Sequence, residues 1–234
     1  MYKALPVLTV EAFNSANQAN VEKEKERVKA KIYKLNNKHR IISNLKSAKI
    51  LGLKDLIESH TNIPHHILRS YKVPELRAAG ISNEKIKEIR KKKPDRVNEN
   101  RTAIAQGRTF EKSVYNYIKA QKEKGYINVT ILYGIWIQYV DSNGLGYAQP
   151  DIVLAETGTN RLFIIECKRT QTDEAILQLE GLYKPLIREL FPQREIYLIQ
   201  VFKNIVEKTD LIYNLMDYMR NPQKKRVNLQ FFGE

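Results

Sequence analysis

The chain has 234 residues, a formal net charge of +14 and a single cysteine. This length suits one moderate domain or two small ones. One cysteine excludes an intrachain disulfide framework, which favours an intracellular, cytoplasmic location. No apolar run approaches the ~20 residues of a transmembrane helix. Residues 1–10 lack a signal-peptide pattern, so we expect no membrane partner.

The positive charge is distributed unevenly along the chain. Residues 1–100 carry 22 Lys and Arg against 11 Asp and Glu, whereas residues 101–234 carry 18 against 15. A local excess of cations is typical of a surface that binds a polyanion such as DNA. The alternative is that this charge serves only solubility.

Residues 1–98 are predicted to form a basic, all-helical domain. Thr9 to about Leu51 has the pattern of one long helix or of two abutting helices. Beyond the segment discussed next, Pro74 is expected to begin a short helix. Ser82 is expected to cap another helix, over residues 83–92.

Residues 54–72 have the apolar spacing of a helix-turn-helix unit, and the same spacing also fits plain helical packing. The turn would fall at Thr61-Asn62, and Pro64 suits the first turn of the second helix. The residues expected to be buried are Ile57, Ile63, Leu68 and Tyr71. The residues expected to face outward and contact DNA are His65, His66 and Arg69.

A lysine run, Lys91, Lys92 and Lys93, follows this helical region. Cations are favourable at a helix C-terminus, and the same three side chains are candidates for DNA contact. Residues 94–100 have the composition of a linker.

A second domain is predicted over residues 99–221, because helical and strand patterns alternate there. The pattern predicts first a helix at 107–124, whose apolar stripe is Phe110, Val114, Tyr117 and Ile118. A strand-like segment at 127–140 and a hairpin at 150–168 follow. The remaining elements are a helix at 172–190 that Pro185 interrupts, a strand at 195–202 and a helix at 209–220. Residues 222–234, with Lys224-Lys225-Arg226, are expected to form a basic tail.

The hairpin carries the most informative residues of the chain. A two-residue turn at Gly158-Thr159 would pair Asp151 directly with Glu166. Directly opposed Cβ atoms lie roughly 4.5–5.5 Å apart, and Lys168 shares the face of Glu166. A turn longer or shorter by one residue would move Asp151 to the opposite face.

Both faces of this hairpin are apolar, which is typical of an inner strand pair covered on both sides. One face is expected to carry Ile152, Leu154, Phe163 and Ile165. The other face is expected to carry Val153, Ala155, Leu162 and Ile164. Charges that end such strands are costly unless they are paired or bound to a metal.

Two carboxylates at this spacing repel each other when ionised, and a divalent cation would satisfy both. Mg²⁺ takes one or two carboxylates together with water and substrate phosphate. A neighbouring lysine can stabilise charge on a phosphoryl oxygen. The pattern therefore indicates metal-assisted phosphodiester hydrolysis; the alternative is an ordinary surface ion pair.

The order helix–strand–strand–strand–helix–strand over residues 101–220, with Pro150-Asp151 and Glu166-Cys167-Lys168, resembles the PD-(D/E)xK nuclease superfamily. The resemblance implies an α/β fold with a small mixed sheet flanked by helices. It implies that Asp151, Glu166 and the backbone carbonyl of Cys167 bind Mg²⁺ or Mn²⁺, and that Lys168 is the catalytic lysine.

Further site residues are implied by the same resemblance. Glu111, beside the apolar stripe of the first helix, matches an additional acid that many members carry; it would also bind metal. Gln178 matches a helical glutamine, although the tyrosine that follows it, Tyr183, lies five residues later rather than four. Glu111 and Gln178 could instead lie on a solvated helix surface. Arg169, next to Lys168, is a further candidate for DNA contact.

The resulting expectation is a metal-dependent deoxyribonuclease, most simply an endonuclease, whose N-terminal domain binds DNA. Resolvase, restriction-like and exonuclease activities stay open, as does assembly into a homodimer. The alternative is an inactive DNA-binding protein on a nuclease-like fold, such as a regulator or a viral or replication accessory. A chain rich in Lys, Asn, Ile and Tyr would suit an AT-rich viral or mobile-element genome, and so the cytoplasm of a host.

Overall fold

The computed structural model describes residues 41–91, 101–204 and 215–231, without the side chains of residues 101–104 and 204. Residues 42–234 group into one compact unit, and the account below concerns that unit. Several sequence predictions lie outside the described residues: the long helix up to residue 40, Lys92, Lys93, the linker at 94–100 and the first part of the closing helix, 209–214.

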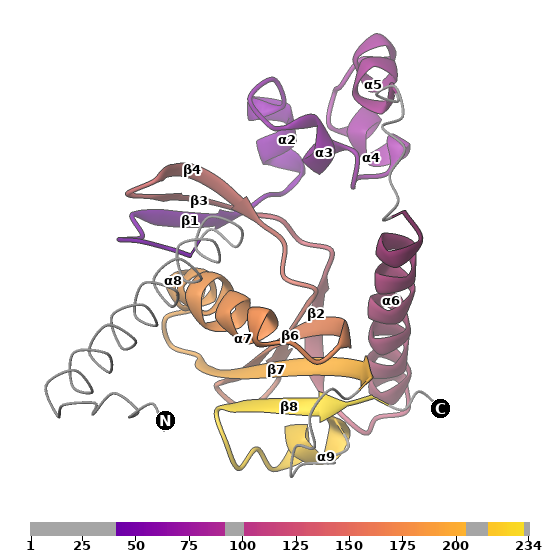
Figure 1. Cartoon of the computed structure of the whole chain (residues 1–234). Coiled ribbons are helices and arrows are strands. Elements are labelled where there is room, and N and C mark those ends of the chain that lie inside the picture. Colours follow the sequence, from indigo (N-terminus) through magenta and orange to yellow (C-terminus); the bar gives the residue numbers. More distant parts are fainter. Residues whose placement is uncertain (1–40, 92–100, 205–214, 232–234) are drawn as a thin grey trace, which may run out of the picture. The chain divides into compact units, whose positions relative to one another are not determined.

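A five-stranded mixed sheet forms the centre of this unit (Figure 1). In spatial order its strands are β2 (Val129–Tyr133), β5 (Ile152–Glu156), β6 (Arg161–Thr170), β7 (Glu195–Asn204) and β8 (Arg226–Gln230). The β2–β5 and β5–β6 pairs are antiparallel, and the β6–β7 and β7–β8 pairs are parallel. The prediction of a mixed α/β fold is confirmed at this level.

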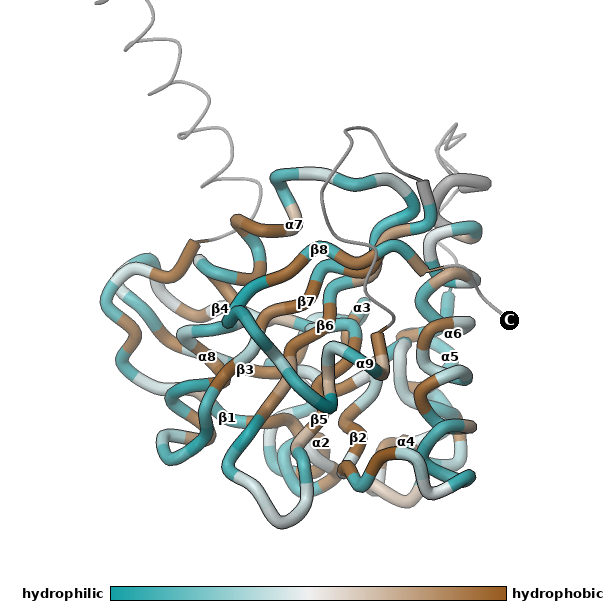
Figure 2. The backbone as a smooth tube through the Cα atoms, turned by 90° about the horizontal axis from the view of Figure 1, so that it is seen from below, coloured by the Kyte–Doolittle hydropathy of each residue, from teal (hydrophilic) through white to brown (hydrophobic). Residues whose placement is uncertain are grey.

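Helices cover both faces of the sheet, as the apolar hairpin predicted. One face packs against α6 (Arg101–Glu123) and α9 (Leu215–Arg220), and it includes Ile152 and Phe163. The other face packs against α7 (Asp173–Gln178), the π-helical turn η1 (Leu179–Tyr183) and α8 (Lys184–Leu190), and it includes Val153 and Ile164. Figure 2 shows the resulting hydrophobic colouring along the central strands.

The helix α6 buries the stripe that its periodicity predicted. Phe110, Val114 and Ile118 are buried in its core-facing side, and Tyr117 packs partly against the same core. Among the described residues, no helix combines the length and the apolar character needed to cross a membrane.

A second, three-stranded sheet corrects two predictions. It consists of β1 (Ser47–Ile50), β3 (Ile137–Asp141) and β4 (Gly144–Ala148), in the order β1–β3–β4. The prediction of one strand over 127–140 is wrong, because Gly134 adopts a φ of +69° and separates β2 from β3. The helical prediction up to Leu51 is wrong at β1, where pairing with β3 overrides the local helical pattern.

Four short helices lie between β1 and α6 in the sequence: α2 (Leu53–Ser59), α3 (His65–Leu68), α4 (Val73–Ala78) and α5 (Asn83–Arg90). Ser82 caps α5 as predicted, because its side chain accepts a hydrogen bond from the Lys85 amide. Ile57 is 53% exposed, contrary to prediction, and Leu56 is buried in its place.

The helix-turn-helix prediction is not supported by the length of α3. This helix is a single turn of four residues after Pro64, whereas a recognition helix lies along the major groove and needs several turns. Ile63, Ile67 and Leu68 are buried in a small core of their own. The helices pack around this core, and DNA reading by residues 54–72 stays a prediction.

The predicted basic tail is wrong for residues 226–230. They form β8, which pairs in parallel with β7, and Val227 and Leu229 are buried. Alternation of apolar and polar residues in Arg226–Gln230 is the pattern of a strand with one buried face. Lys224 and Lys225, which precede this pattern, favoured the prediction of a basic tail.

We predict that Gly146→Ala destabilises the three-stranded sheet. A Cβ at residue 146 would lie 2.2 Å from the Tyr139 ring, so the ring has to move. Overpacking of this kind costs about 1–3 kcal/mol of unfolding free energy, which urea denaturation measures.

Gly107→Ala is the matched control for that change. A Cβ there meets no described atom within 4 Å beyond its neighbours in α6. Alanine in a helix interior is favoured over glycine by roughly 0.5–1 kcal/mol. Equal stability of the two variants would contradict the packing of Tyr139 against residue 146.

Candidate active site

The hairpin register places Asp151 opposite Glu166, as predicted. Ile152 pairs with Ile165, so the next residues outward on the two strands are this pair of acids. Gly158 has a φ of +83° in the turn, a conformation that glycine adopts without strain. Asp151 Oδ2 accepts a hydrogen bond of 2.7 Å from the Cys167 amide, which ties its carboxylate to β6.

Glu166 is the most buried charged group of the site, at 2% exposure. Its Oε1 contacts Lys168 Nζ, while its Oε2 is buried without a hydrogen-bond partner among the described residues. The pKa of Glu166 is raised to about 8: burial raises it most, the charges of Asp151 and Glu111 also raise it, and Lys168 lowers it. This carboxyl group is therefore held where its ionised form lacks compensation.

The other two acids are also displaced from their ordinary titration. Burial raises the pKa of Asp151, against the Cys167 amide and Lys168. Burial, and then the charge of Asp151, raise the pKa of Glu111 to about 7. Glu111 reaches the site from α6, and the Tyr133 hydroxyl donates a hydrogen bond to it.

Lys168 is the positive charge of the cluster. Burial alone would lower its pKa, but Glu166 and Asp151 outweigh burial and raise it. Its Nζ also lies 3.4 Å from Gln178 Oε1. The ammonium group is thus held between an acid on its own strand and a helix on the covering layer.

The π-helical turn η1 explains the unusual spacing between Gln178 and Tyr183. An added residue per turn brings positions five apart onto one face of a helix. Gln178 Nε2 donates to the Tyr183 hydroxyl at 2.5 Å, and that hydroxyl donates to the Gln149 carbonyl at 2.9 Å. The chain of contacts therefore runs from the residue before Pro150-Asp151 to the side chain that touches Lys168.

The Cys167 thiol does not belong to the acidic cluster. It packs against the core beneath α6, and burial raises its pKa well above the ordinary value. A protonated thiol is a poor metal ligand. Metal binding by the Cys167 carbonyl, the group that the resemblance implies, stays a prediction.

A divalent cation such as Mg²⁺ needs oxygen ligands that lie close together. Within the described part of the chain, no group of three or more His, Cys, Asp or Glu side chains is arranged to hold a metal ion. Asp151 and Glu166 are therefore a two-carboxylate pair, with Glu111 nearby but not converging on them. One or two carboxylates and a free buried oxygen suit Mg²⁺, which retains several waters.

The predicted DNA-contacting residues that the structure describes lie in more than one place: His66 and Arg69 line one cleft, and Arg169 lines another. His65 and Lys91 are exposed. Arg69 donates to the carbonyls of Ile89 and Lys91, so its guanidinium ties α3 to the end of α5. Arg169 contacts the Gln106 side chain and lines a separate hollow with Lys203.

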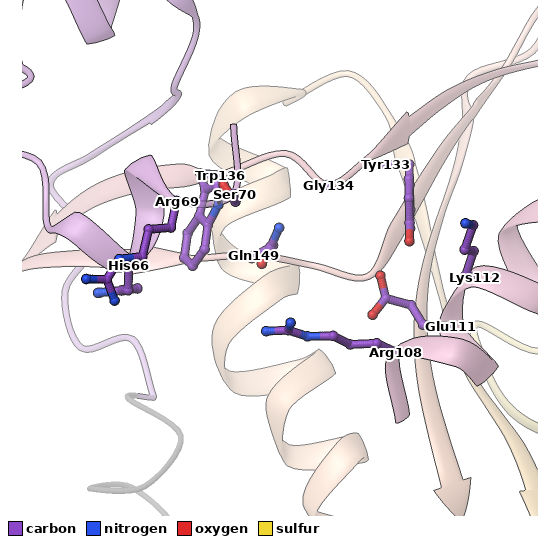
Figure 3. Close-up of a pocket in the computed structure, with 10 residues that line it drawn as sticks. All are labelled: His66, Arg69, Ser70, Arg108, Glu111, Lys112, Tyr133, Gly134, Trp136 and Gln149. Carbon is purple, nitrogen blue, oxygen red and sulfur yellow. Dashed lines mark hydrogen bonds between the residues drawn. The ribbon is translucent and has the colours of Figure 1, made fainter. Parts of the chain in front are cut away.

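An open cleft of about 750 Å³ adjoins the acidic cluster and contains residues that sequence reasoning missed (Figure 3). Its lining residues are His66, Arg69, Ser70, Arg108, Glu111, Lys112, Tyr133, Gly134, Trp136 and Gln149. Arg108 and Lys112 lie one helical turn apart on α6, with Glu111 between them in the chain, and this spacing was present in the sequence. Tyr133 and Trp136 could not be recognised from the sequence, because the strand pattern there does not reveal that β2 ends before Gly134.

Gln200 is another residue that sequence reasoning missed. It pairs with Glu166 in the β6–β7 register, and it is fully buried. Neither its amide oxygen nor its amide nitrogen has a hydrogen-bond partner among the described residues. A lone amide inside the apolar strand Glu195–Asn204 was the available signal.

Comparisons of the chain with protein-family models, curated proteins and solved structures give no match. Function is therefore inferred from the geometry and chemistry of the site.

We predict that the metal-free protein loses stability as the pH rises from about 5 to about 8. The pKa of Glu166 is about 8 in the fold against 4.5 ordinarily. The folded state therefore binds the extra proton, and this contribution is complete below the lower value and lost through the upper one. Glu166→Gln removes the titrating group and should flatten the profile.

The measurement is thermal unfolding with EDTA across this pH range. Glu189→Gln, at an exposed position of α8, is the matched control and should retain the wild-type slope. A wild-type protein that gains stability over the same range would contradict the buried state of Glu166.

Proposed function

We propose that this protein is a Mg²⁺- or Mn²⁺-dependent deoxyribonuclease of the PD-(D/E)xK type. The observation that carries the proposal is the paired Asp151 and Glu166 across the central strands, with Lys168 beside them. A buried acid pair with strongly displaced pKa values next to a cleft is the arrangement expected of a functional site.

The order of elements supports the same family. The succession α6, β2, β5, β6, α7 and β7 follows the helix–strand–strand–strand–helix–strand order that the resemblance implies, with β3 and β4 inserted after the first strand. Fold alone does not assign an activity. The proposal therefore depends on the acids and the lysine more than on the topology.

Each residue has a role that its contacts suggest. Asp151 is oriented by the Cys167 amide, and Glu166 offers an oxygen that has no other partner among the described residues. When bound, the divalent cation would polarise the phosphodiester and lower the pKa of a bound water. Lys168, fixed by Glu166 and Gln178, would stabilise negative charge on a phosphate oxygen.

Glu111 fits an assisting role better than that of a primary ligand. It does not join a three-acid cluster, but its charge interacts with Asp151 and Lys168. A pKa of about 7 would let this carboxyl group exchange a proton near neutral pH. Substrate or a metal-bound water could be its partner.

We predict that Asp151→Asn and Lys168→Ala each lower the rate of DNA cleavage by ~100-fold or more. The assay uses supercoiled, linear, single-stranded and four-way-junction DNA with Mg²⁺ or Mn²⁺. Lys87→Ala, exposed on α5, is the control for loss of a lysine and should keep the wild-type rate.

The outcomes separate the two functions considered. Metal-dependent cleavage that both variants lose would support the nuclease, and the preferred substrate would identify its subclass. Tight DNA binding with no cleavage of any substrate would instead favour an inactive DNA-binding protein. Cleavage that survives both substitutions would place the active site elsewhere.

Gln178→Leu is predicted to lower the cleavage rate by about tenfold, since neighbours that orient a functional group contribute on this scale. The side chain touches Lys168 and Tyr183, so the pH profile of the rate should change as well. Gln193→Leu, exposed before β7, is the control. A lower rate with an unchanged pH profile would contradict an action through Lys168.

A further inference from the structure

The cleft of about 750 Å³ has walls from four segments of the chain, one of which contributes only Gln149. His66, Arg69 and Ser70 come from α3 and the residues that follow it, and Arg108, Glu111 and Lys112 come from α6. Tyr133 and Trp136 come from the connection between β2 and β3. Figure 3 shows Arg108 extending from α6 toward the wall that holds His66 and Trp136.

Cations and aromatic rings both line this cleft. Arg108 and Lys112 are exposed side chains that lie one turn apart on α6. Across from Arg108, the Trp136 indole lies edge-on to His66, with ring centres 5.8 Å apart. Sites for single-stranded nucleic acid combine these two features, because cations follow the phosphates and flat rings stack on bases.

The Trp136 ring is held in place before any ligand binds. Its Nε1 donates to Ser70 Oγ at 2.8 Å, and its backbone carbonyl accepts from the Leu51 amide at 2.8 Å. A ring already fixed in orientation loses little conformational entropy when a base packs against it.

The size of the cleft favours one strand over two. A cube of this volume has an edge of roughly 9 Å, and one major groove of B-DNA is already about 12 Å wide. A duplex is broader than its groove, so it would not sit wholly inside a cleft of this volume. A single strand, with its bases unpaired, can reach the rings and the cations together.

The cleft adjoins the acidic cluster through Glu111 and Gln149. Glu111 lines the cleft and interacts electrostatically with Asp151 and Lys168. Gln149 also lines it, and its carbonyl accepts from Tyr183, two residues before Asp151 in the chain. A strand that occupies the cleft would therefore present its backbone to the candidate active site.

We propose that this cleft binds one unpaired strand of DNA, with phosphates at Arg108 and Lys112 and a base against Trp136. The inference rests on the proposed function for its choice of DNA among polyanions. It adds that the substrate carries a single-stranded segment, such as an end, a flap or an opened duplex.

The chain provides its own probe, because Trp136 is its one tryptophan. We expect a short oligothymidylate, titrated into the full-length protein with EDTA, to quench the Trp136 fluorescence saturably. A blunt duplex of the same length should quench much less. Inorganic polyphosphate should bind without comparable quenching, because it has charge but no bases.

Variants then locate the phosphates. Arg108→Gln and Lys112→Gln should each reduce the salt dependence of oligothymidylate binding, by about 0.7 in the slope of log K against log salt. Arg188→Gln on α8 and Lys122→Gln further along α6 are the matched controls, since both are exposed and lie outside the lining of the cleft. These controls should keep the wild-type slope.

The experiment distinguishes the cleft from the nuclease activity, because it needs neither metal nor cleavage. Quenching by the single strand, with reduced slopes in the cleft variants only, would support the cleft even if no DNA were ever cut. Equal quenching by duplex and single strand would overturn the inference. So would wild-type slopes in both cleft variants, including in a protein that cleaves DNA.

Discussion

Asp151 and Glu166 are held across the β5–β6 pair at the edge of an apolar core, where water screens their repulsion poorly. The hairpin cannot relieve this repulsion by sliding without repacking, because a shift of one residue would move every packed side chain of the shifted strand to the opposite face of the sheet. The fold instead surrounds the acids with an amide, an ammonium group and a free cleft. Most polar contacts near the site are arranged around that constraint.

The polar contacts around the acids extend into the helices that cover the sheet. Gln178 and Tyr183 meet only because η1 is a π-helical turn, and together they join the Gln149 carbonyl to Lys168. Pro185 follows directly in α8 and cannot donate a backbone hydrogen bond to the preceding turn. Local irregularity in this helix therefore coincides with the contact that fixes the lysine.

The central hairpin could be predicted from the sequence because two independent signals agreed. The turn at Gly158 and the apolar runs Ile152 to Ala155 and Leu162 to Ile165 both indicate a hairpin, and the centre of the turn then sets the register. The nearby break at Gly134 could not be predicted in this way, since a strand pattern persists on both sides of it. β1 was missed for a related reason: its partner, β3, lies some ninety residues away and leaves no local trace.

The site residues also differ in whether the local sequence reveals their proximity. Asp151, Glu166 and Lys168 are close in sequence terms once the hairpin is drawn, so their proximity could be inferred. Trp136, from the connection between β2 and β3, and Arg108, from α6, line the same cleft only because of the tertiary fold. The five-residue spacing between Gln178 and Tyr183 does not fit an ideal α-helix, so their contact could not be predicted from the sequence.

The turn η1 also affects whether the contact between Gln178 and Tyr183 would persist if a residue were inserted or deleted between them. A deletion of one residue between Gln178 and Tyr183 would restore ordinary helical spacing, and the two side chains would still share a face. Insertion and deletion at this point are then close to neutral for the contact. Chains that differ here in length can carry the same glutamine–tyrosine pair, and a search with a fixed gap between them would find only some of those chains.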